Sequence, residues 1–392
     1  MSGFGTRAVH AGSGHDAQTG AVIPAISLST TFAQSAPSVP IGKYEYSRSD
    51  NPNRDGFETV VASLENAKYA LGFASGSAAI AVILHTLTLG DHVVSVSDVY
   101  GGTHRYFTKV ANHSGINVSF SGDLEKELPT LLNEKTKLVW IETPSNPTLS
   151  LTDISKIKSI IVDYQAKHPT QKISLVVDNT FLSPYIQTPL DHGADIVMHS
   201  VTKYLNGHSD VVMGVAATND DAIAERLRFF QNAIGAIPSP FDSWLAHRGL
   251  KTLHLRVRQA SNNANAIAKY LAASDKVLKV NYPGLENHPQ RGIFLKQHNH
   301  GLGGGMISFR IKGGKEAASK FTSSTKIFTL AESLGGVESL LEVPSIMTHG
   351  GIPVAEREAN GIFDDLIRLS CGIEDEEDLI ADIKQALEAA TN

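Results

Sequence analysis

Apolar residues between about positions 55 and 220 are gathered in short runs, with amphipathic segments between them. Two of these segments, 57–67 and 77–89, have the apolar spacing of helices. The runs are continuously apolar rather than alternating, which favours strands of a mainly parallel sheet with helices on both faces. The rhythm of strands and helices predicts a doubly wound α/β domain. The predicted strands are 69–75, 92–98, 137–143, 173–178, 195–200 and 211–218.

The last third of the chain has a different pattern. A long helical segment covers residues 253–272, and residues 306–311 and 366–370 have the character of strands. A final helix opens with the acidic run 374–378, which complements the helix dipole. The apolar face of this final helix is formed by Leu379, Ile380, Ile383 and Leu387. We expect a smaller α+β domain here.

The first fifty residues are poor in periodic segments and rich in Ser, Gly and Pro. This composition predicts an extended arm. A partly disordered tail is the alternative, but Phe32, Tyr44 and Tyr46 make the segment too apolar for a free tail. We therefore favour an arm that packs on another subunit.

Composition narrows the class of protein. Of the 392 residues, 42% are hydrophobic and 19% are charged, which excludes a mainly disordered chain. The net charge of -6 argues against a protein that coats nucleic acid or anionic membranes. A single cysteine, Cys371, excludes an internal disulfide, and we interpret it as a small buried residue. Because the N-terminus has no signal-peptide character, we expect a cytoplasmic protein without membrane or nucleic-acid partners.

In a doubly wound sheet, ligands bind at the carboxyl ends of the strands. The loops that follow Ser75, Asp98, Thr143, Asp178 and Ser200 are therefore expected to converge. This edge of the sheet is where we look for chemistry.

The first candidate feature is a strand, a glycine turn and an immediate helix around Gly76 and Ser77. Free N–H groups at such a helix start can bind a phosphate, although many turns of this kind hold nothing. No Gly-Lys-Ser follows, so the motif is not a P-loop. The glycine-rich segment 301–305 is not a dinucleotide fingerprint, because a strand follows it.

The second and third features are an acid and a lysine. Asp178 ends an apolar strand, where it could cap the next loop or pair with a protonated ring nitrogen. Lys203 follows another strand, between hydroxyl residues and apolar ones, and such surroundings can make an amine nucleophilic toward an aldehyde. Nearby His199 and His208 match no trusted metal motif, and we predict no metal site.

A phosphate cradle, an acid for a ring nitrogen and a lysine for an aldehyde are the three handles of pyridoxal 5′-phosphate (PLP). With these features the sequence resembles the Cys/Met-metabolism group of fold-type I PLP enzymes, from about Thr6 to Ala390. Seven motifs carry the resemblance, in the expected order. They are residues 44–48 (YEYSR), 98–103 (DVYGGT), 142–148 (ETPSNPT), 177–180 (VDNT), 200–204 (SVTKY), 248–253 (RGLKTL) and 331–336 (AESLGG).

The resemblance implies roles for residues that bind the cofactor. Lys203 matches the lysine that binds the PLP aldehyde, and Asp178 matches the acid that pairs with the ring nitrogen. Tyr100 matches the aromatic residue that stacks on the ring, and it is a candidate acid–base group. The positions that match phosphate donors are Gly76, Ser77, Ser200 and Thr202.

The resemblance also implies roles in substrate binding. Arg368 matches the arginine that binds the substrate α-carboxylate, where a guanidinium fork is better suited than an amine. Asn146 and Ser333 match groups that help place cofactor and substrate. Glu45 and Glu332 match acids near the mouth of the site that could attract a distal ammonium. The alternative interpretation is two solvated glutamates.

Assembly follows from the same resemblance. Tyr46 and Arg48 match residues that reach the phosphate of a neighbouring subunit. This implies shared active sites in a homotetramer built as a dimer of dimers. The implied organisation is an N-terminal arm at 1–50 that contacts the neighbouring subunit, a large PLP-binding domain at 51–252 and a C-terminal α+β domain at 253–392.

The activity implied by the resemblance is that of a carbon–sulfur lyase. It would cleave L-cystathionine at Cγ to L-cysteine, 2-oxobutanoate and ammonia. A β-lyase, a γ-synthase or a sulfhydrylase of the same family is the near alternative. A catalytically inactive scaffold is disfavoured by the intact Lys203, Asp178 and Arg368, and a nicotinamide dehydrogenase by the missing glycine fingerprint.

Overall fold

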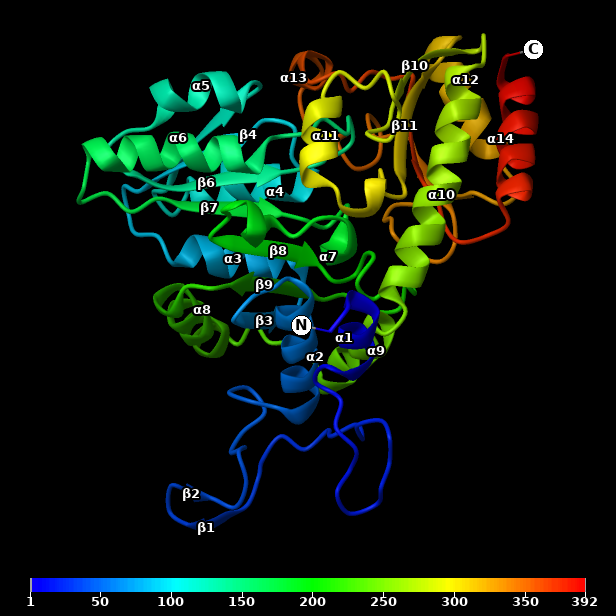
Figure 1. Cartoon of the computed structure of the whole chain (residues 1–392). Helices are drawn as coiled ribbons and strands as arrows, with labels where there is room; N and C mark the ends of the chain where they lie inside the picture. The colour runs from blue at the N-terminus through cyan, green and yellow to red at the C-terminus, as the bar shows by residue number, and fades with distance from the viewer. Residues whose placement is uncertain (1, 392) are drawn as a thin grey trace.

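The computed structural model describes residues 2–391. Its larger part is built on a seven-stranded sheet with the strand order β3-β9-β8-β7-β6-β4-β5 (Figure 1). All six predicted apolar runs are strands, shorter by a few residues at some ends. The strands are β3 Tyr69–Phe73, β4 His92–Val96, β5 Asn117–Ser121, β6 Thr136–Glu142, β7 Ser174–Asp178, β8 Ile196–Ser200 and β9 Gly214–Thr218.

The sheet is mainly parallel, as the sequence predicts, with one exception. Strand β9 runs antiparallel to both of its neighbours, β3 and β8. The connection 201–213 contains no helix, and a parallel return usually needs a helical crossover. Strand β5 lies outside the predicted set, because it is at the edge of the sheet and mixes polar with apolar residues.

Helices cover both faces of the large sheet. Along β9, Val215 and Ala217 pack in a core with α2 and α9, whereas Ala216 packs in the core that contains α3 and α8. The alternation of side chains along a strand makes these opposite faces. The helices of this part are α2 Pro52–Leu64, α3 Gly76–His85, α4 Gly101–Arg105, η1 Tyr106–Ala111, α5 Leu124–Leu131, α6 Ile154–Lys167, α7 Ser183–Ile186, η2 Pro189–His192, α8 Asp221–Ile234 and α9 Pro240–Leu250.

Helix α2 begins earlier than its apolar pattern predicts. Asn51 accepts a hydrogen bond from the Asn53 backbone N–H, and Pro52 takes the first helical position. Both are favoured start signals, so the polar first turn is helical although it carries no apolar periodicity.

A five-stranded sheet of order β10-β11-β14-β13-β12 forms the second part, with its own core. The predicted helix 253–272 and strands 306–311 and 366–370 are confirmed, and Cys371 is buried in this core. The division between the parts at residue 252 stays a prediction. The elements are α10 Leu253–Ala272, β10 Val277–Asn281, α11 Arg291–Gln297, η3 Asn299–Gly301, β11 Met306–Ile311, α12 Gly314–Ser324, β12 Thr329–Leu330, β13 Leu340–Glu342, α13 Val354–Ala359, β14 Leu366–Ser370 and α14 Glu376–Thr391.

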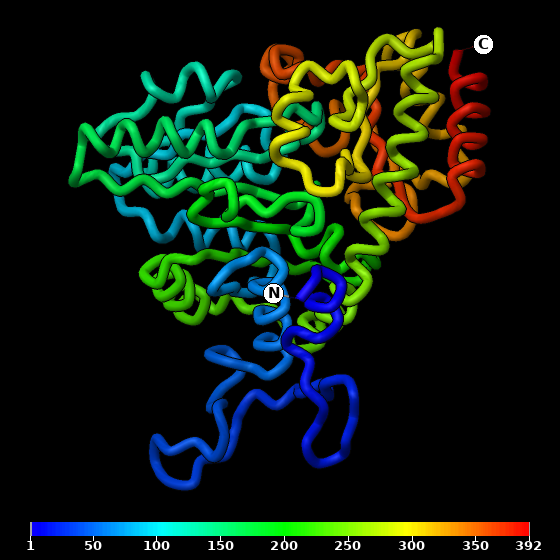
Figure 2. The backbone as a smooth tube through the Cα atoms, viewed as in Figure 1, coloured from blue at the N-terminus to red at the C-terminus, as the bar shows by residue number. Residues whose placement is uncertain are grey.

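Residues 11–50 extend away from both sheets as a long looping segment (Figure 2). A small hairpin of β1 Gln34–Ala36 and β2 Val39–Pro40 lies within it. An additional helix, α1 Phe4–His10, has no counterpart in the sequence pattern. It is short, and it is stabilised by packing on α2, where Ala8 is fully buried. No helix within residues 2–391 has the length and hydrophobicity needed to cross a membrane.

Candidate active site

A cavity of about 270 Å³ lies at the carboxyl edge of the large sheet. It is closed on one side by loops of the C-terminal part. The expected convergence of loops is therefore confirmed for the segments after β3, β4, β6, β7 and β8. Among the predicted site residues, those that line the cavity are Gly76, Ser77, Tyr100, Asn146, Asp178, Ser200, Thr202, Lys203, Glu332, Ser333 and Arg368.

The start of α3 forms one wall of this cavity. Ser75 caps the helix by accepting a hydrogen bond from the Ala78 N–H at 3.0 Å. A Cβ on Gly76 would lie 3.1 Å from the Cβ of Ser200, so glycine lets the two loops approach closely. The remaining free N–H groups and the positive end of the helix dipole suit an anion. The hydroxyls of Ser77, Ser200 and Thr202 border the same space.

Lys203, which the sequence predicts to be the reactive amine, lines the cavity. Burial, reinforced by the positive charge of Arg368, lowers the pKa of Lys203 to about 8. Its Nζ donates a hydrogen bond to Ser333 Oγ over 2.7 Å. The lowered pKa increases the fraction of this amine that is neutral, and therefore nucleophilic, near neutral pH.

Two carboxylates, the buried Glu142 and the half-buried Asp178, lie on neighbouring strands and line the cavity. Asp178 on β7 is the register partner of Glu142 on β6. Burial raises the pKa of Asp178, and burial together with the charge of Asp178 raises the pKa of Glu142 to about 8. Neither forms an ion pair within residues 2–391.

The hydrogen bonds of the two acids differ. Glu142 accepts from the Tyr100 N–H at 2.8 Å and from the Thr103 hydroxyl at 2.9 Å, which fixes the start of α4. Asp178 accepts through Oδ1 alone, from the N–H and the hydroxyl of Thr180. Its other oxygen is left for a ligand. A half-buried acid that faces the cavity without a protein cation is the partner that a protonated ring nitrogen needs, so these residues fit PLP.

Arg368 lies on β14 at the opposite wall. Its Nη1 donates to Asn146 Oδ1 over 3.0 Å, and its Nη2 donates to the Ser333 carbonyl over 2.9 Å. The carboxylate of Glu342 lies 3.1 Å from Nη1. These contacts hold a buried guanidinium in the same cavity as Lys203.

Sequence reasoning assigned no role to three residues around the cavity. Glu142 and Thr348 line the cavity, and Glu342 is a buried acid behind it that contacts Thr348 and Arg368. Glu142 ends an apolar strand in the same way as Asp178, which is a signal that could have identified it. Glu342 and Thr348 carry no comparable signal, because only the fold of the C-terminal part brings them to Arg368.

Glu45, Tyr46 and Arg48 do not line this cavity. Arg48 donates to Asn232 Oδ1 over 3.1 Å, and its guanidinium lies 5.2 Å from the centre of the Tyr46 ring. All three side chains are exposed on the single chain. Their roles in a neighbouring site stay predictions.

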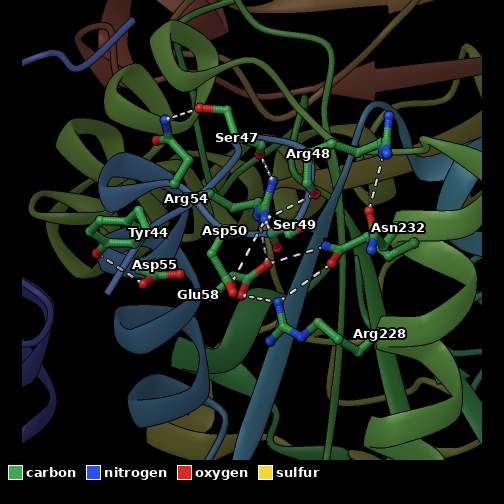
Figure 3. A network of polar contacts seen from close by, with 12 residues as sticks. Tyr44, Ser47, Arg48, Ser49, Asp50, Arg54, Asp55, Glu58, Arg228 and Asn232 are labelled. Carbon is green, nitrogen blue, oxygen red and sulfur yellow. Dashed lines mark hydrogen bonds and ion pairs between the residues drawn. The ribbon is translucent and has the colours of Figure 1, made fainter. Parts of the chain in front are cut away.

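A network of polar contacts fixes the arm at its base (Figure 3). Arg54 is buried and donates to the Ser47 carbonyl over 2.9 Å. Its Nε lies 3.6 Å from Glu58, which in turn pairs with Arg228 of α8 at 2.9 Å. The position of residues 47–50 is therefore set by the large domain, whereas the preceding residues extend away from it.

Comparison with known proteins agrees with this geometry. Residues 5–388 match the model of the family described as Cys/Met metabolism PLP-dependent enzyme. The cystathionine γ-lyase of Saccharomyces cerevisiae is 66% identical to this chain, and the match covers 99% of this chain and 98% of the relative. The cystathionine γ-lyase of Dictyostelium discoideum is 55% identical, and the match covers 98% of this chain and 97% of the relative. The crystal structure of the yeast cystathionine γ-lyase superposes with a TM-score of 0.96 at 65% identity, covering 100% of this chain and 99% of the other.

Proposed function

The chain belongs to the Cys/Met metabolism family of PLP-dependent enzymes, and we propose that it works as a cystathionine γ-lyase. The reaction converts L-cystathionine to L-cysteine, 2-oxobutanoate and ammonia. One observation carries the mechanism. Lys203, whose pKa is lowered, shares a cavity with the unpaired, half-buried Asp178 and the buried Arg368. Relatives that bear this name match nearly the whole chain.

The cavity offers a place for each end of PLP. When bound, this cofactor supplies an electron sink for the negative charge that develops at the substrate α-carbon. Backbone N–H groups at Gly76 and Ser77, with the hydroxyls of Ser200 and Thr202, would hold its phosphate. Asp178 would keep a proton on its ring nitrogen. This proton is what makes the ring an effective electron sink.

Lys203 performs the proton transfers. Its neutral amine can remove the proton from the substrate α-carbon. After it has released that proton, the same amine can remove a second proton from Cβ. Departure of the thiolate from Cγ follows the loss of the Cβ proton, and the thiolate needs a proton as it leaves. Tyr100, at the mouth of the same cavity, is a candidate donor, and its backbone is fixed by Glu142.

Charged side chains at the two ends of the substrate would orient it in the cavity. Arg368 would bind the α-carboxylate with two parallel hydrogen bonds. Glu332 is exposed at the edge of the cavity, where a carboxylate can attract the distal ammonium of cystathionine. We propose the same for Glu45 of a neighbouring subunit. The two acids would favour a substrate that is positively charged at its far end.

Product analysis tests the proposed function. Incubation of the purified PLP-bound enzyme with L-cystathionine is expected to give cysteine and 2-oxobutanoate in equal amounts, because the C–S bond at Cγ breaks. Chromatography of the products separates these from homocysteine and pyruvate. A predominance of homocysteine and pyruvate would instead identify a β-lyase, and consumption of cystathionine only with an added thiol would identify a synthase or sulfhydrylase.

We propose that the enzyme is a homotetramer, a dimer of dimers whose active sites are shared between chains. The exposed arm supports this assembly, because Val22, Leu28 and Ile41 are each more than 60% exposed on the single chain. Apolar side chains gathered on an arm of this kind are typically covered by a partner. A cytoplasmic location is proposed because the single cysteine needs no oxidising compartment.

Mixing two inactive variants tests the shared site. Arg48→Ala should inactivate the neighbour's site, and Lys203→Ala should inactivate its own. In a mixed dimer, one site carries both lesions and the other carries neither, so activity is expected to return. 2-Oxobutanoate release should be measured after subunit exchange verified with differently tagged chains. If exchange occurs and no activity returns, Arg48 serves its own chain and the shared-site proposal fails.

A further inference from the structure

A fully buried carboxylate lies directly beside the proposed substrate-binding arginine. Glu342 ends β13, and its register partner on β14 is Arg368. The two side chains form an ion pair, with 3.1 Å between Glu342 Oε1 and Arg368 Nη1. Both are shielded from solvent, since Arg368 is 3% exposed and Glu342 is 0% exposed. A charge pair at this depth interacts strongly, because little water screens it.

Several groups hold the Arg368 guanidinium, but they do not use all of its N–H donors. Asn146 and Ser333 accept one hydrogen bond each from its two Nη atoms. Its Nε has no hydrogen-bond partner within the described chain. A guanidinium has five N–H groups, so donors remain for an incoming carboxylate. The ion pair with Glu342 therefore orients Arg368 without using all of its capacity.

Glu342 itself is held by two contacts. Its Oε1 accepts a hydrogen bond from the Thr348 hydroxyl at 2.7 Å, in addition to the ion pair with Arg368. Its Oε2 has no hydrogen-bond partner among residues 2–391. An unsatisfied buried oxygen is unfavourable by itself. Arg368 is the only cation with which Glu342 forms an ion pair in this part of the chain.

We propose that Glu342 is the internal counter-ion and positioning residue of Arg368, and that its charge limits how tightly the arginine binds the substrate α-carboxylate. Before substrate binds, Glu342 compensates the buried guanidinium. When substrate arrives, its carboxylate shares the guanidinium with Glu342. The attraction is then weaker than a lone buried arginine would give, which favours release of the carboxylate product.

The surrounding charges agree with this role. Lys203 lies in the same cavity, where the charge of Arg368 lowers its pKa and the charges of Glu342 and Glu332 raise it. Arg368 in turn lowers the pKa of Glu342, against the effect of burial. Glu342 therefore moderates the field of Arg368 at Lys203 as well as at the substrate position. If the ion pair only joined β13 to β14, its loss would change the stability of the protein and nothing else.

Because this inference rests on the proposed role of Arg368, the experiment uses a simple carboxylate that cannot react. Hexanoate has the carboxylate but no α-amine, and hexanamide has the same shape without the charge. Binding of each to the PLP-bound enzyme is measured by calorimetry. Glu342→Gln keeps the shape of the side chain and removes its charge. We expect hexanoate to bind this variant roughly tenfold more tightly, with hexanamide unchanged.

Two further readouts separate this role from a structural one. The free Glu342→Gln enzyme should unfold at a lower temperature, and hexanoate should stabilise it more than it stabilises the wild type, because the ligand replaces the lost counter-ion. The visible absorbance of the bound cofactor should also titrate at lower pH in the variant. Loss of Glu342 removes a charge that raises the pKa of the cavity lysine.

A matched control is Glu338→Gln, which removes the same charge from an exposed position on the same segment and should leave hexanoate affinity unchanged. If Glu342→Gln does not fold, Thr348→Val removes the hydroxyl that holds Oε1 and should tighten hexanoate binding by about threefold. Equal hexanoate affinity in the wild type and in the folded variant would overturn the inference.

A different set of results would overturn the role of Arg368 in the proposed function. If Arg368→Lys binds hexanoate as tightly as the wild type, or if the wild type does not bind it at all, Arg368 is not the carboxylate-binding residue. That result would overturn the substrate orientation proposed above and the role of Glu342 with it. A wild type that binds hexanoate through Arg368, with unaltered binding after Glu342→Gln, overturns only the role of Glu342.

Discussion

Lys203→Ala should lower turnover of L-cystathionine by a factor on the order of 10⁴ or more while the protein remains folded. In the proposed mechanism one amine would both hold the cofactor and move the protons, so both functions should be lost together. The side chain is half-buried at the cavity rather than packed in a core, and its Nζ makes a single hydrogen bond, to Ser333. The measurement is 2-oxobutanoate release, with circular dichroism to verify folding.

An exposed lysine supplies the control. Lys126 lies on the solvent side of α5, and Lys126→Ala should retain wild-type activity. Cofactor retention gives an independent readout, because Lys203→Ala should lose PLP during gel filtration when the wild type keeps it. A folded Lys203→Ala enzyme that releases 2-oxobutanoate at a near-normal rate would show that another amine does the chemistry.

Asp178→Asn should reduce turnover by roughly 10²–10³-fold and weaken retention of the cofactor. The substitution keeps the shape of the side chain but removes the charge that holds a proton on the ring nitrogen. Asp178→Ala should have a larger effect, because it also removes the acceptor for the Thr180 hydroxyl. Steady-state kinetics on L-cystathionine and equilibrium dialysis of PLP measure the two effects.

Glu142, the neighbouring acid, gives the matched comparison for Asp178. Burial and the charge of Asp178 raise the pKa of Glu142, which favours its protonated form. Glu142→Gln therefore removes little charge, and its cost should be no more than about tenfold, through the Tyr100 and Thr103 contacts. If the two amide variants lose activity equally, the specific role of Asp178 at the ring nitrogen is wrong.

Local sequence determined much of this protein. Six continuously apolar runs predicted six strands of the large sheet, because a strand covered on both faces is apolar at every position. The chain order also placed Asp178, Ser200 and Lys203 at one edge of the sheet, because parallel strands end on the same side. The order of residues along the chain was therefore enough to bring the lysine, the acid and the helix start together at one site.

Other features depended on tertiary structure. Strand β9 is antiparallel because its connection to β8 has no helix, and β5 is an edge strand whose mixed composition gives no continuous apolar run. Helix α1 exists because Ala8 is buried on α2, which no local pattern of seven residues specifies. A contact distant in sequence decided the outcome for α1, whereas the connection decided it for β9 and the place at the sheet edge decided it for β5.

The charged residues of the site show the same contrast between what the sequence and the tertiary structure determine. Residue type made Arg368 a candidate for binding a carboxylate, but its ion pair with Glu342 arises from the pairing of β13 with β14. The lowered pKa of Lys203 requires burial under a loop more than a hundred residues away, which carries Ser333. Sequence determined which reacting groups are present, whereas the tertiary structure decided their protonation and their partners, because burial and distance control the strength of charge interactions.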